Sequence, residues 1–294
     1  MATMSYDELD GQIWMNGTMV PWAEAKVHVL THGLHYASCV FEGERVYDGV
    51  IFKLTQHTER LHRSARFLDF ELPYSVAAID EACRQVVAAN RIVDGYVRPV
   101  AWRGSEMMGV SAQANRINVA IAAWQWPSYF SPEARMKGIR LKTSSWRRPS
   151  PQSAPVHSKA AGLYMICTLS KHAAEREGFD DALMLDWRGQ IAEATGANVF
   201  LVIDGTLHTP TPDCFLDGIT RQTVMELARA RGYPLLERAI MPDELARASE
   251  VFVCGTAAEV TPVSAIDERR FAVGEITKTL MRDYEATVRL KKAA

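Results

Sequence analysis

The 294-residue sequence has no excess of positive charge and no long apolar run. Its 33 lysines and arginines stand against 35 acids, so no general basic field is present for nucleic acid or an anionic membrane surface. The chain has no stretch of about 18 apolar residues, and its first residues carry acids where a signal peptide has a basic region. We therefore expect a soluble, cytoplasmic protein that acts on small molecules and binds neither nucleic acid nor membrane.

Cysteine is also scarce, and its spacing excludes two kinds of site. The 5 cysteines are odd in number and never form a CxxC spacing: Cys39, Cys83, Cys167, Cys214 and Cys254. A disulfide framework or a zinc site needs closely spaced or paired ligands, so neither is indicated, and we expect no metal.

Length and composition predict two domains. A single hydrophobic core stops growing at roughly 250 to 300 residues, and proline, serine and glycine gather between residues 127 and 138. We predict a small α+β domain at 1–127, an interdomain linker at 128–137 and a larger C-terminal α/β domain at 138–294. A ligand site at the meeting of two such domains is the expected arrangement.

Turn dipeptides and apolar periodicity predict the elements. Alternation around Asn16-Gly17 and Asp48-Gly49 predicts hairpins, because both dipeptides tolerate positive φ. Helical spacing predicts helices at 55–69, 76–90, 160–176, 218–231 and 274–290. β-rich runs predict strands at 96–102, 117–124, 139–145, 182–186, 191–194, 199–203 and 250–254.

Lys159 stands out among the nine lysines of the chain. Ala160, Ala161 and Gly162 follow it and give it no carboxylate partner within one helical turn. Desolvation disfavours the charged form of an amine, and a neutral lysine can form a Schiff base with a carbonyl. The alternative is a solvated surface lysine, which is the common state of this residue type.

Glu193 is an acid among apolar residues, followed by the small residues of the segment 194–198. Such an acid can accept a hydrogen bond from a protonated pyridine nitrogen, which makes the ring a better electron sink. An exposed turn acid is the alternative for Glu193, and Asn198 can simply stabilise the turn. Together, Lys159 and Glu193 indicate pyridoxal phosphate chemistry.

Two segments offer donors to a phosphate. Gly218 and Thr220 open a predicted helix, whose first N–H groups have no intrahelical partner. The segment 255–258 follows a predicted strand and presents further backbone N–H groups, with the hydroxyl of Thr256 among them. Arg60 could supply a fixed positive charge. For Asp217 the alternative is an ordinary helix N-cap.

Eight sequence strings, in order along most of the chain, resemble the class IV pyridoxal-phosphate aminotransferases and are most similar to the branched-chain amino acid aminotransferases. They are His35-Tyr36, Phe41-Glu42-Gly43 with Arg45, Glu59-Arg60-Leu61-His62, Tyr96-Val97-Arg98-Pro99, Lys159 with Tyr164, the segment 193–200, Gly218-Ile219-Thr220-Arg221 and the segment 255–262. The resemblance implies a D-amino-acid-transaminase-like fold (pyridoxal-phosphate fold type IV), with the cofactor between two domains and a dimer completing each site.

The resemblance also implies roles for individual residues. Lys159 would bind pyridoxal 5'-phosphate and move the proton, and Glu193 would hold the pyridine nitrogen. The other cofactor-binding residues would be Arg60, Tyr164, Leu216, Gly218, Ile219, Thr220 and Thr256. The substrate-binding residues would be Tyr36, Phe41, Tyr96, Arg98, Met108, Val110, Trp126, Ala257 and Ala258. The reaction implied is transamination between leucine, isoleucine or valine and 2-oxoglutarate, by a homodimer at minimum, with a hexamer left open.

The chain departs from the family pattern at Glu44 and Asp217, which we expect to add negative charge near the site, and in the segment 103–109. The same catalytic lysine serves several reactions on this fold. An (R)-amine or D-amino acid transaminase therefore remains an alternative, and a non-catalytic protein that binds pyridoxal phosphate is an alternative of another class. Tyr96 with Arg98 favours the branched-chain group.

Overall fold

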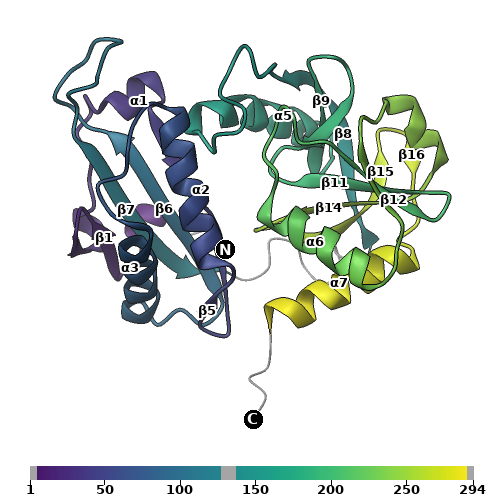
Figure 1. The fold of residues 1–294 in the computed structure, drawn as a ribbon, viewed down its shortest axis with the longest axis horizontal. Coiled ribbons are helices and arrows are strands. Elements are labelled where there is room, and N and C mark those ends of the chain that lie inside the picture. Colours follow the sequence, from purple (N-terminus) through teal and green to yellow (C-terminus); the bar gives the residue numbers. More distant parts are fainter. Residues whose placement is uncertain (1–4, 127–136, 290–294) are drawn as a thin grey trace. The chain divides into compact units, whose positions relative to one another are not determined.

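A computed structural model describes residues 5–126 and 137–289. They form two compact units, drawn in Figure 1. The first comprises the described residues of Met1–Pro127 together with Ser158–Gly162, and the second comprises those of Ser128–His157 and Leu163–Ala294. Apart from Lys137, the predicted linker at 128–137 lies outside the described residues, and the domain ranges stay a prediction.

The first unit is built on a 7-stranded sheet with the order β2-β1-β7-β6-β4-β5, in which β3 also pairs with β6. The strands are β1 (Gln12–Met15), β2 (Thr18–Pro21), β3 (Cys39–Phe41), β4 (Glu44–Tyr47), β5 (Val50–Ile51), β6 (Gly95–Arg103) and β7 (Ile117–Gln125). Both predicted hairpins form, and Asn16, Gly17, Asp48 and Gly49 all have positive φ, as their turns require.

Helices α2 (Leu54–Phe67) and α3 (Val76–Ala89) lie beside each other in the first unit, and α3 packs against β1, β6 and β7 (Figure 1). Their buried faces carry Leu61, Ala65, Ile79 and Val86, the spacing expected of amphipathic helices. Ser75 caps α3, since its Oγ accepts a hydrogen bond from the Ala78 N–H at 3.2 Å. The short elements are η1 (Tyr6–Glu8), η2 (Trp22–Glu24) and α1 (His32–Tyr36).

The second unit holds a 9-stranded sheet with the order β10-β9-β8-β15-β14-β11-β12-β13, with β16 paired to β15. Its strands are β8 (Ile139–Arg148), β9 (Asp181–Asp186), β10 (Ile191–Ala194), β11 (Asn198–Ile203), β12 (Thr206–Pro210), β13 (Leu235–Arg238), β14 (Ala248–Gly255), β15 (Glu259–Ile266) and β16 (Arg269–Arg270). An additional pairing of β10 with β11 closes part of the sheet into a barrel. Alternate residues such as Val199, Leu201, Val251 and Val253 form its apolar core.

Helices pack against the barrel of the second unit. Helix α5 (Met165–Arg176), which follows η3 (Ala161–Tyr164), lies on β8 and β9, whereas α6 (Ile219–Ala230) and α7 (Glu275–Val288) pack on each other and on β14. The remaining short element is η4 (Pro242–Arg247). No helix among the described residues is long and apolar enough to span a membrane.

Candidate active site

The backbone around Lys159 is fixed by hydrogen bonds within the first unit. The Lys159 N–H donates to Ser64 Oγ on α2 at 3.0 Å, and its carbonyl accepts from the Phe41 N–H at 3.1 Å. Ser158 Oγ donates to the Ser64 carbonyl at 2.9 Å, and Ala160 forms a β-bridge with Val40. The lysine is therefore held between β3 and α2 by the backbone on both of its sides.

The side chain of Lys159 lies in an environment that favours the neutral amine. Its Nζ is 5.0 Å from the centre of the Phe41 ring. Burial, followed by the positive charge of Arg60, lowers the pKa of the Lys159 amine to about 8, although Glu42 acts in the opposite direction. Such an amine is available as a nucleophile near neutral pH, as the sequence predicted.

Arg60 is oriented by a buried acid that sequence reasoning missed. Its Nε and Nη2 donate to the two oxygens of Glu42, at 2.6 and 2.9 Å, and His57 Nδ1 lies 2.7 Å from Glu42 Oε2. Burial raises the pKa of Glu42, but the charges of Arg60 and His57 outweigh it and hold that pKa below its ordinary range. The bidentate pair fixes the plane of the guanidinium.

Four of the predicted substrate residues lie together in the first unit. The Arg98 guanidinium is stacked 4.7 Å from the centre of the Phe41 ring and 5.3 Å from that of Tyr96, and the rings of Tyr96 and Trp126 are 5.4 Å apart. A Cβ at Gly43 would collide with the Tyr96 hydroxyl, so only glycine fits there. The group combines an apolar surface with one positive charge.

Tyr36 contacts the segment that holds Met108 and Val110. The Tyr36 hydroxyl donates to the Met108 carbonyl at 3.2 Å, and His32 stacks on the Tyr36 ring and contacts the Gly109 carbonyl. Tyr36 is 46% and Val110 86% exposed. No hydrogen bond or ring contact among the described residues joins Tyr36 to Arg98, and their joint contact with one carboxylate stays a prediction.

In the second unit, Glu193 on β10 is paired with an arginine. Arg148 Nε at the end of β8 lies 3.3 Å from Glu193 Oε1, with the two side chains only 5% and 12% exposed. Burial lowers the pKa of Arg148, but the negative charge of Glu193, followed by contributions that include Tyr164, raises it above the ordinary value. Glu193 and Tyr164 are thus both neighbours of one buried cation.

The first turn of α6 has no side-chain cap. Its N-cap is Gly218, which offers no side-chain acceptor to the N–H groups of the first turn, and Thr220 is buried beside them. The alternative of a cap by Asp217 is therefore not realised. Leu216 precedes this turn, and Thr256, Ala257 and Ala258 occupy the turn between β14 and β15, where Gly255 lies against the Gly196 carbonyl.

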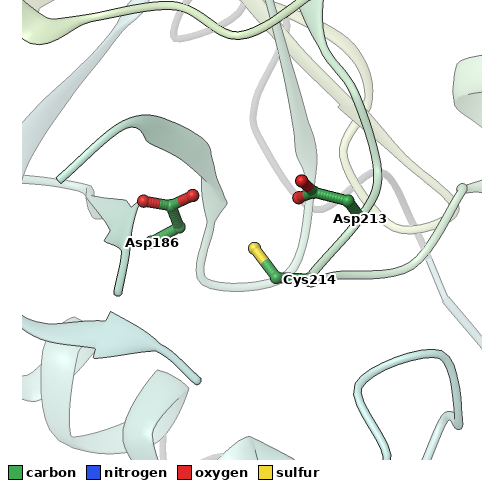
Figure 2. Close-up of side chains that lie close together, drawn as sticks. All are labelled: Asp186, Asp213 and Cys214. Atoms are coloured by element: carbon green, nitrogen blue, oxygen red, sulfur yellow. The ribbon is translucent and has the colours of Figure 1, made fainter. Parts of the chain in front are cut away.

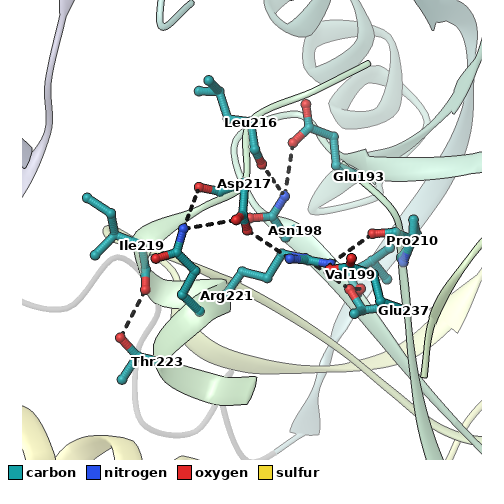
Figure 3. A network of polar contacts seen from close by, with 12 residues as sticks. Glu193, Asn198, Val199, Pro210, Leu216, Asp217, Ile219, Arg221, Thr223 and Glu237 are labelled. Atoms are coloured by element: carbon teal, nitrogen blue, oxygen red, sulfur yellow. Dashed lines mark hydrogen bonds and ion pairs between the residues drawn. The ribbon is translucent and has the colours of Figure 1, made fainter. Parts of the chain in front are cut away.

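Asp217 lies directly before the N-cap of α6 and is ion-paired there. Its carboxylate accepts a hydrogen bond from Arg221 Nη1 at 2.8 Å and one from Gln222 Nε2 at 2.9 Å (Figure 3). Arg221 is buried and is also bonded to Glu237 and the Pro210 carbonyl. Because this one cation pairs with both Asp217 and Glu237, it compensates only part of their negative charge, and the expected charge at Asp217 stays a prediction.

For Glu44, burial acts against the expectation of added negative charge. Its side chain is completely buried in the first unit, and neither carboxyl oxygen has a hydrogen-bond partner among the described residues. Burial, followed by the charges of Glu42 and Asp80, raises the pKa of Glu44 well above its ordinary value. Burial therefore favours the neutral form of this acid, which adds no charge when it is protonated.

One cluster of potential metal ligands occurs among the described residues, formed by Asp186, Asp213 and Cys214 with ligand atoms within 4.8 Å of one another (Figure 2). Arg188 Nη2 already lies 2.6 Å from Asp186 Oδ2 and 2.7 Å from Asp213 Oδ2. Burial raises the pKa of Cys214 to about 12, so its thiol stays protonated. The cluster is an ion-pair group bridged by arginine.

Three residues of the groups around Lys159 and Glu193 were given no role from sequence, namely Glu42, His57 and Arg148. Glu42 belongs to the string Phe41-Glu42-Gly43, but its partners come from another element, α2. Arg148 stands before a proline-rich loop, and nothing in its local sequence connects it with Glu193, 45 positions later. Only the parallel and antiparallel pairing of β8, β9 and β10 brings these two residues together.

The fold and the arrangement of these groups define an aminotransferase. A family model described as amino-transferase class IV matches residues 39–266, and the chain belongs to this family. The branched-chain-amino-acid aminotransferase of Pseudomonas aeruginosa is 41% identical over 288 residues, which cover 96% of this chain and 94% of that protein. The enzyme of the same name from Escherichia coli K12 is 40% identical over 281 residues, covering 92% and 91%.

Solved structures agree with this assignment. A branched-chain amino acid aminotransferase from T.th., solved with pyridoxamine 5'-phosphate, superposes with a TM-score of 0.93 at 40% identity, covering 97% of this chain and 96% of that chain. The Escherichia coli branched-chain amino acid aminotransferase gives a TM-score of 0.93 at 38% identity, covering 97% of each chain. The mixed α/β type IV fold predicted from sequence is confirmed.

Proposed function

We propose that this protein transfers the amino group between a branched-chain L-amino acid and 2-oxoglutarate, with pyridoxal 5'-phosphate as its cofactor. The observation that carries the proposal is Lys159, a backbone-fixed amine with a pKa lowered to about 8 in a chain of the class IV family. The relatives named above carry the branched-chain name, and one of their structures holds pyridoxamine 5'-phosphate.

The donor set fits this cofactor. The uncapped first turn of α6 and the hydroxyls of Thr220 and Thr256 suit a phosphate, and Arg60 adds charge. Glu193 suits a protonated ring nitrogen because Arg148 favours its negative form. Tyr164 would hydrogen-bond the phenolic oxygen, while Leu216 would pack against the ring and Gly218 and Ile219 would present backbone N–H groups. When bound, the cofactor supplies an electron sink for the substrate's α-carbon.

Lys159 acts first as the nucleophile that attaches the cofactor and then as the base that moves the substrate's α-proton. Both roles require a neutral amine, which burial and Arg60 favour. The ion pair of Arg60 with Glu42 keeps that cation in place near the lysine. Fixing the backbone on both sides of Lys159 limits the side chain to a short path.

The substrate contacts follow from the aromatic group of the first unit. Phe41, Tyr96 and Trp126 offer an apolar surface to a branched side chain, whereas Arg98 offers a charge to the distal carboxylate of glutamate or 2-oxoglutarate. One site can thus accept both substrates of the two half-reactions. Backbone N–H groups of Ala257 and Ala258 would bind the α-carboxylate.

A homodimer would complete the site. Large apolar side chains are exposed in the first unit, and a mostly apolar cavity of about 410 Å³ lies among them. They include Val27, Val29, Leu30, Leu34, Tyr36, Met107 and Val110. A second copy that covers this surface would bring its own Tyr36, Met108 and Val110 to the first copy's substrate.

The test is a product analysis with protein loaded with pyridoxal phosphate. We expect L-leucine and 2-oxoglutarate to yield glutamate and the branched 2-oxo acid in equal amounts, with D-alanine and an (R)-arylalkylamine reacting far more slowly. Faster turnover of either of these two donors would replace the proposal by the corresponding alternative. The absence of any amino-group transfer would reject it.

A further inference from the structure

Asn198 is the first residue of β11 and the direct pairing partner of Glu193 on β10. Directly opposed residues of an antiparallel pair have neighbouring side chains on one face of the sheet. Asn198 is only 5% exposed, and its Nδ2 lies 3.4 Å from Glu193 Oε2, so it donates a long hydrogen bond to that oxygen. Arg148 approaches the other oxygen, Oε1. The carboxylate of Glu193 is therefore held at both oxygens.

The same amide also reaches the turn that begins α6. Asn198 Nδ2 donates a second hydrogen bond, of 3.1 Å, to the Leu216 carbonyl, and Figure 3 shows the side chain between Glu193 and Leu216. A Cβ at Gly218 would lie 2.2 Å from Asn198 Oδ1, so any larger residue at this position would displace the amide. One side chain thus connects the acid on β10 with the N-terminal end of α6.

A purely local role of Asn198 does not account for these contacts. The turn between β10 and β11 is closed by the backbone, because the Ala194 N–H donates to the Ala197 carbonyl at 2.8 Å. The backbone of Asn198 is itself paired with Cys254 on β14. The side chain is therefore not needed for the turn, the alternative that the sequence left open, and its bond to the Leu216 carbonyl leads away from the turn.

We propose that Asn198 is a positioning residue, whose amide fixes the orientation of the Glu193 carboxylate and its spacing from the helix end at Gly218. The proposal rests on the proposed function, in which Glu193 binds the ring nitrogen and the α6 N-terminus binds the phosphate of one rigid cofactor. Because both groups of that cofactor are fixed relative to each other, both protein groups must be fixed as well. Asn198 provides the link between them.

The test compares Asn198→Asp with Asn198→Ala. Aspartate keeps the size and shape of asparagine but loses both donor hydrogens and opposes its charge to that of Glu193. We expect the dissociation constant of pyridoxal phosphate from the apo-protein to rise about tenfold in Asn198→Ala, the loss typical of a hydrogen bond to a charged group, and further in Asn198→Asp. The visible absorbance of the bound cofactor is expected to shift in the same order. We also expect kcat to fall by a larger factor than the factor by which KM for leucine changes.

Asn90→Ala is the matched control, because the Asn90 amide also donates to two carbonyls, those of Gln12 and Ala123, in the first unit. It should lower Tm and leave the cofactor affinity and absorbance unchanged. If Asn198→Asp binds the cofactor as tightly as the wild type, or better than Asn198→Ala, the residue only fills space and the proposal is overturned. Asn198→Ser, which keeps a small donor, should give an intermediate affinity if the alanine variant does not fold. A wild-type protein that fails to bind pyridoxal phosphate would reject the proposed function instead.

Discussion

Arg148 Nε and Glu193 Oε1 lie 3.3 Å apart, and both side chains are nearly enclosed in the second unit. Taking either charge out of water is costly, so each partner compensates the burial of the other. Arg148 also contacts the Leu163 carbonyl and Cys167 Sγ, both at 3.5 Å. The acid assigned to the ring nitrogen is consequently kept in its charged form by a cation that the local sequence does not reveal.

Loss of the Arg148 charge should destabilise the folded protein strongly. We predict that Arg148→Met lowers the free energy of unfolding of the apo-protein by about 3 to 5 kcal/mol, the range for a buried charge left without its partner. Adding Glu193→Gln should recover a large part of that loss, because no charge then remains unpaired. Urea unfolding of both variants measures the coupling. Arg247→Met, which removes an exposed pair with Asp204, should cost about 1 kcal/mol or less. Strictly additive losses at Arg148 and Glu193 would contradict the coupling.

Arg98 should discriminate between the two substrates. Its guanidinium lies against Phe41 and Tyr96, and its buried Nε has no hydrogen-bond partner in the described residues. We predict that Arg98→Met raises KM for 2-oxoglutarate about 10- to 100-fold, as expected for a lost charged hydrogen bond, and KM for leucine about threefold at most, since methionine keeps the packing. Steady-state kinetics with each substrate varied in turn give the two values. Equal increases would remove Arg98 from recognition of the distal carboxylate.

Glu44 should make stability depend on pH. Because its folded-state pKa is raised well above 4.5, the folded protein keeps a proton that the unfolded chain loses as the pH rises past that value. The free energy of unfolding therefore falls with increasing pH up to the folded pKa, by at most about 1.4 kcal/mol per pH unit. We predict that Glu44→Gln removes this slope and is more stable than the wild type at pH 8. Glu59→Gln, at an exposed position on α2, serves as the control, and an unchanged slope in Glu44→Gln would contradict the prediction.

The lowered pKa of Lys159 has a kinetic consequence. The rate at which apo-protein attaches pyridoxal phosphate should rise tenfold per pH unit below about 8 and level off above it, because the neutral amine is then fully populated. Arg60→Met should move the midpoint upward, since the positive charge of Arg60 contributes to the lowering. Stopped-flow absorbance measures the rate. A rate that still rises tenfold per unit between pH 9 and 10 would indicate an amine with an ordinary pKa.

Much of the fold could be predicted from sequence because its signals are local. Turn dipeptides gave both hairpins of the first unit, and apolar periodicity gave α2, α3 and α6 to within about two residues, which is the usual uncertainty at helix ends. Strands β3, β12, β13, β15 and β16 were not predicted. Several are short, and β3, β13 and β15 also depend on pairing with strands far away in the chain.

The residues of the candidate site also divide into those with a local sequence signal and those without one. Lys159 and Glu193 could be proposed because their unusual settings are visible in neighbouring residues. Glu42, His57 and Arg148 could not, since each is defined by a partner on another element. For Glu44 the charge was inferred from residue type alone, whereas burial favours its neutral form. Asp217 shares the buried Arg221 with Glu237, a pairing that its local sequence does not show.

The central claim is that Lys159 carries the cofactor, and it can be tested by chemical trapping. Protein loaded with pyridoxal phosphate is reduced with borohydride, which makes the attachment permanent, and is then digested and analysed by mass spectrometry. The account predicts one pyridoxyl group per chain, on Lys159, and none on Lys159→Ala treated in the same way. A stoichiometric adduct on another of the nine lysines, or none at all in the wild type, would contradict it.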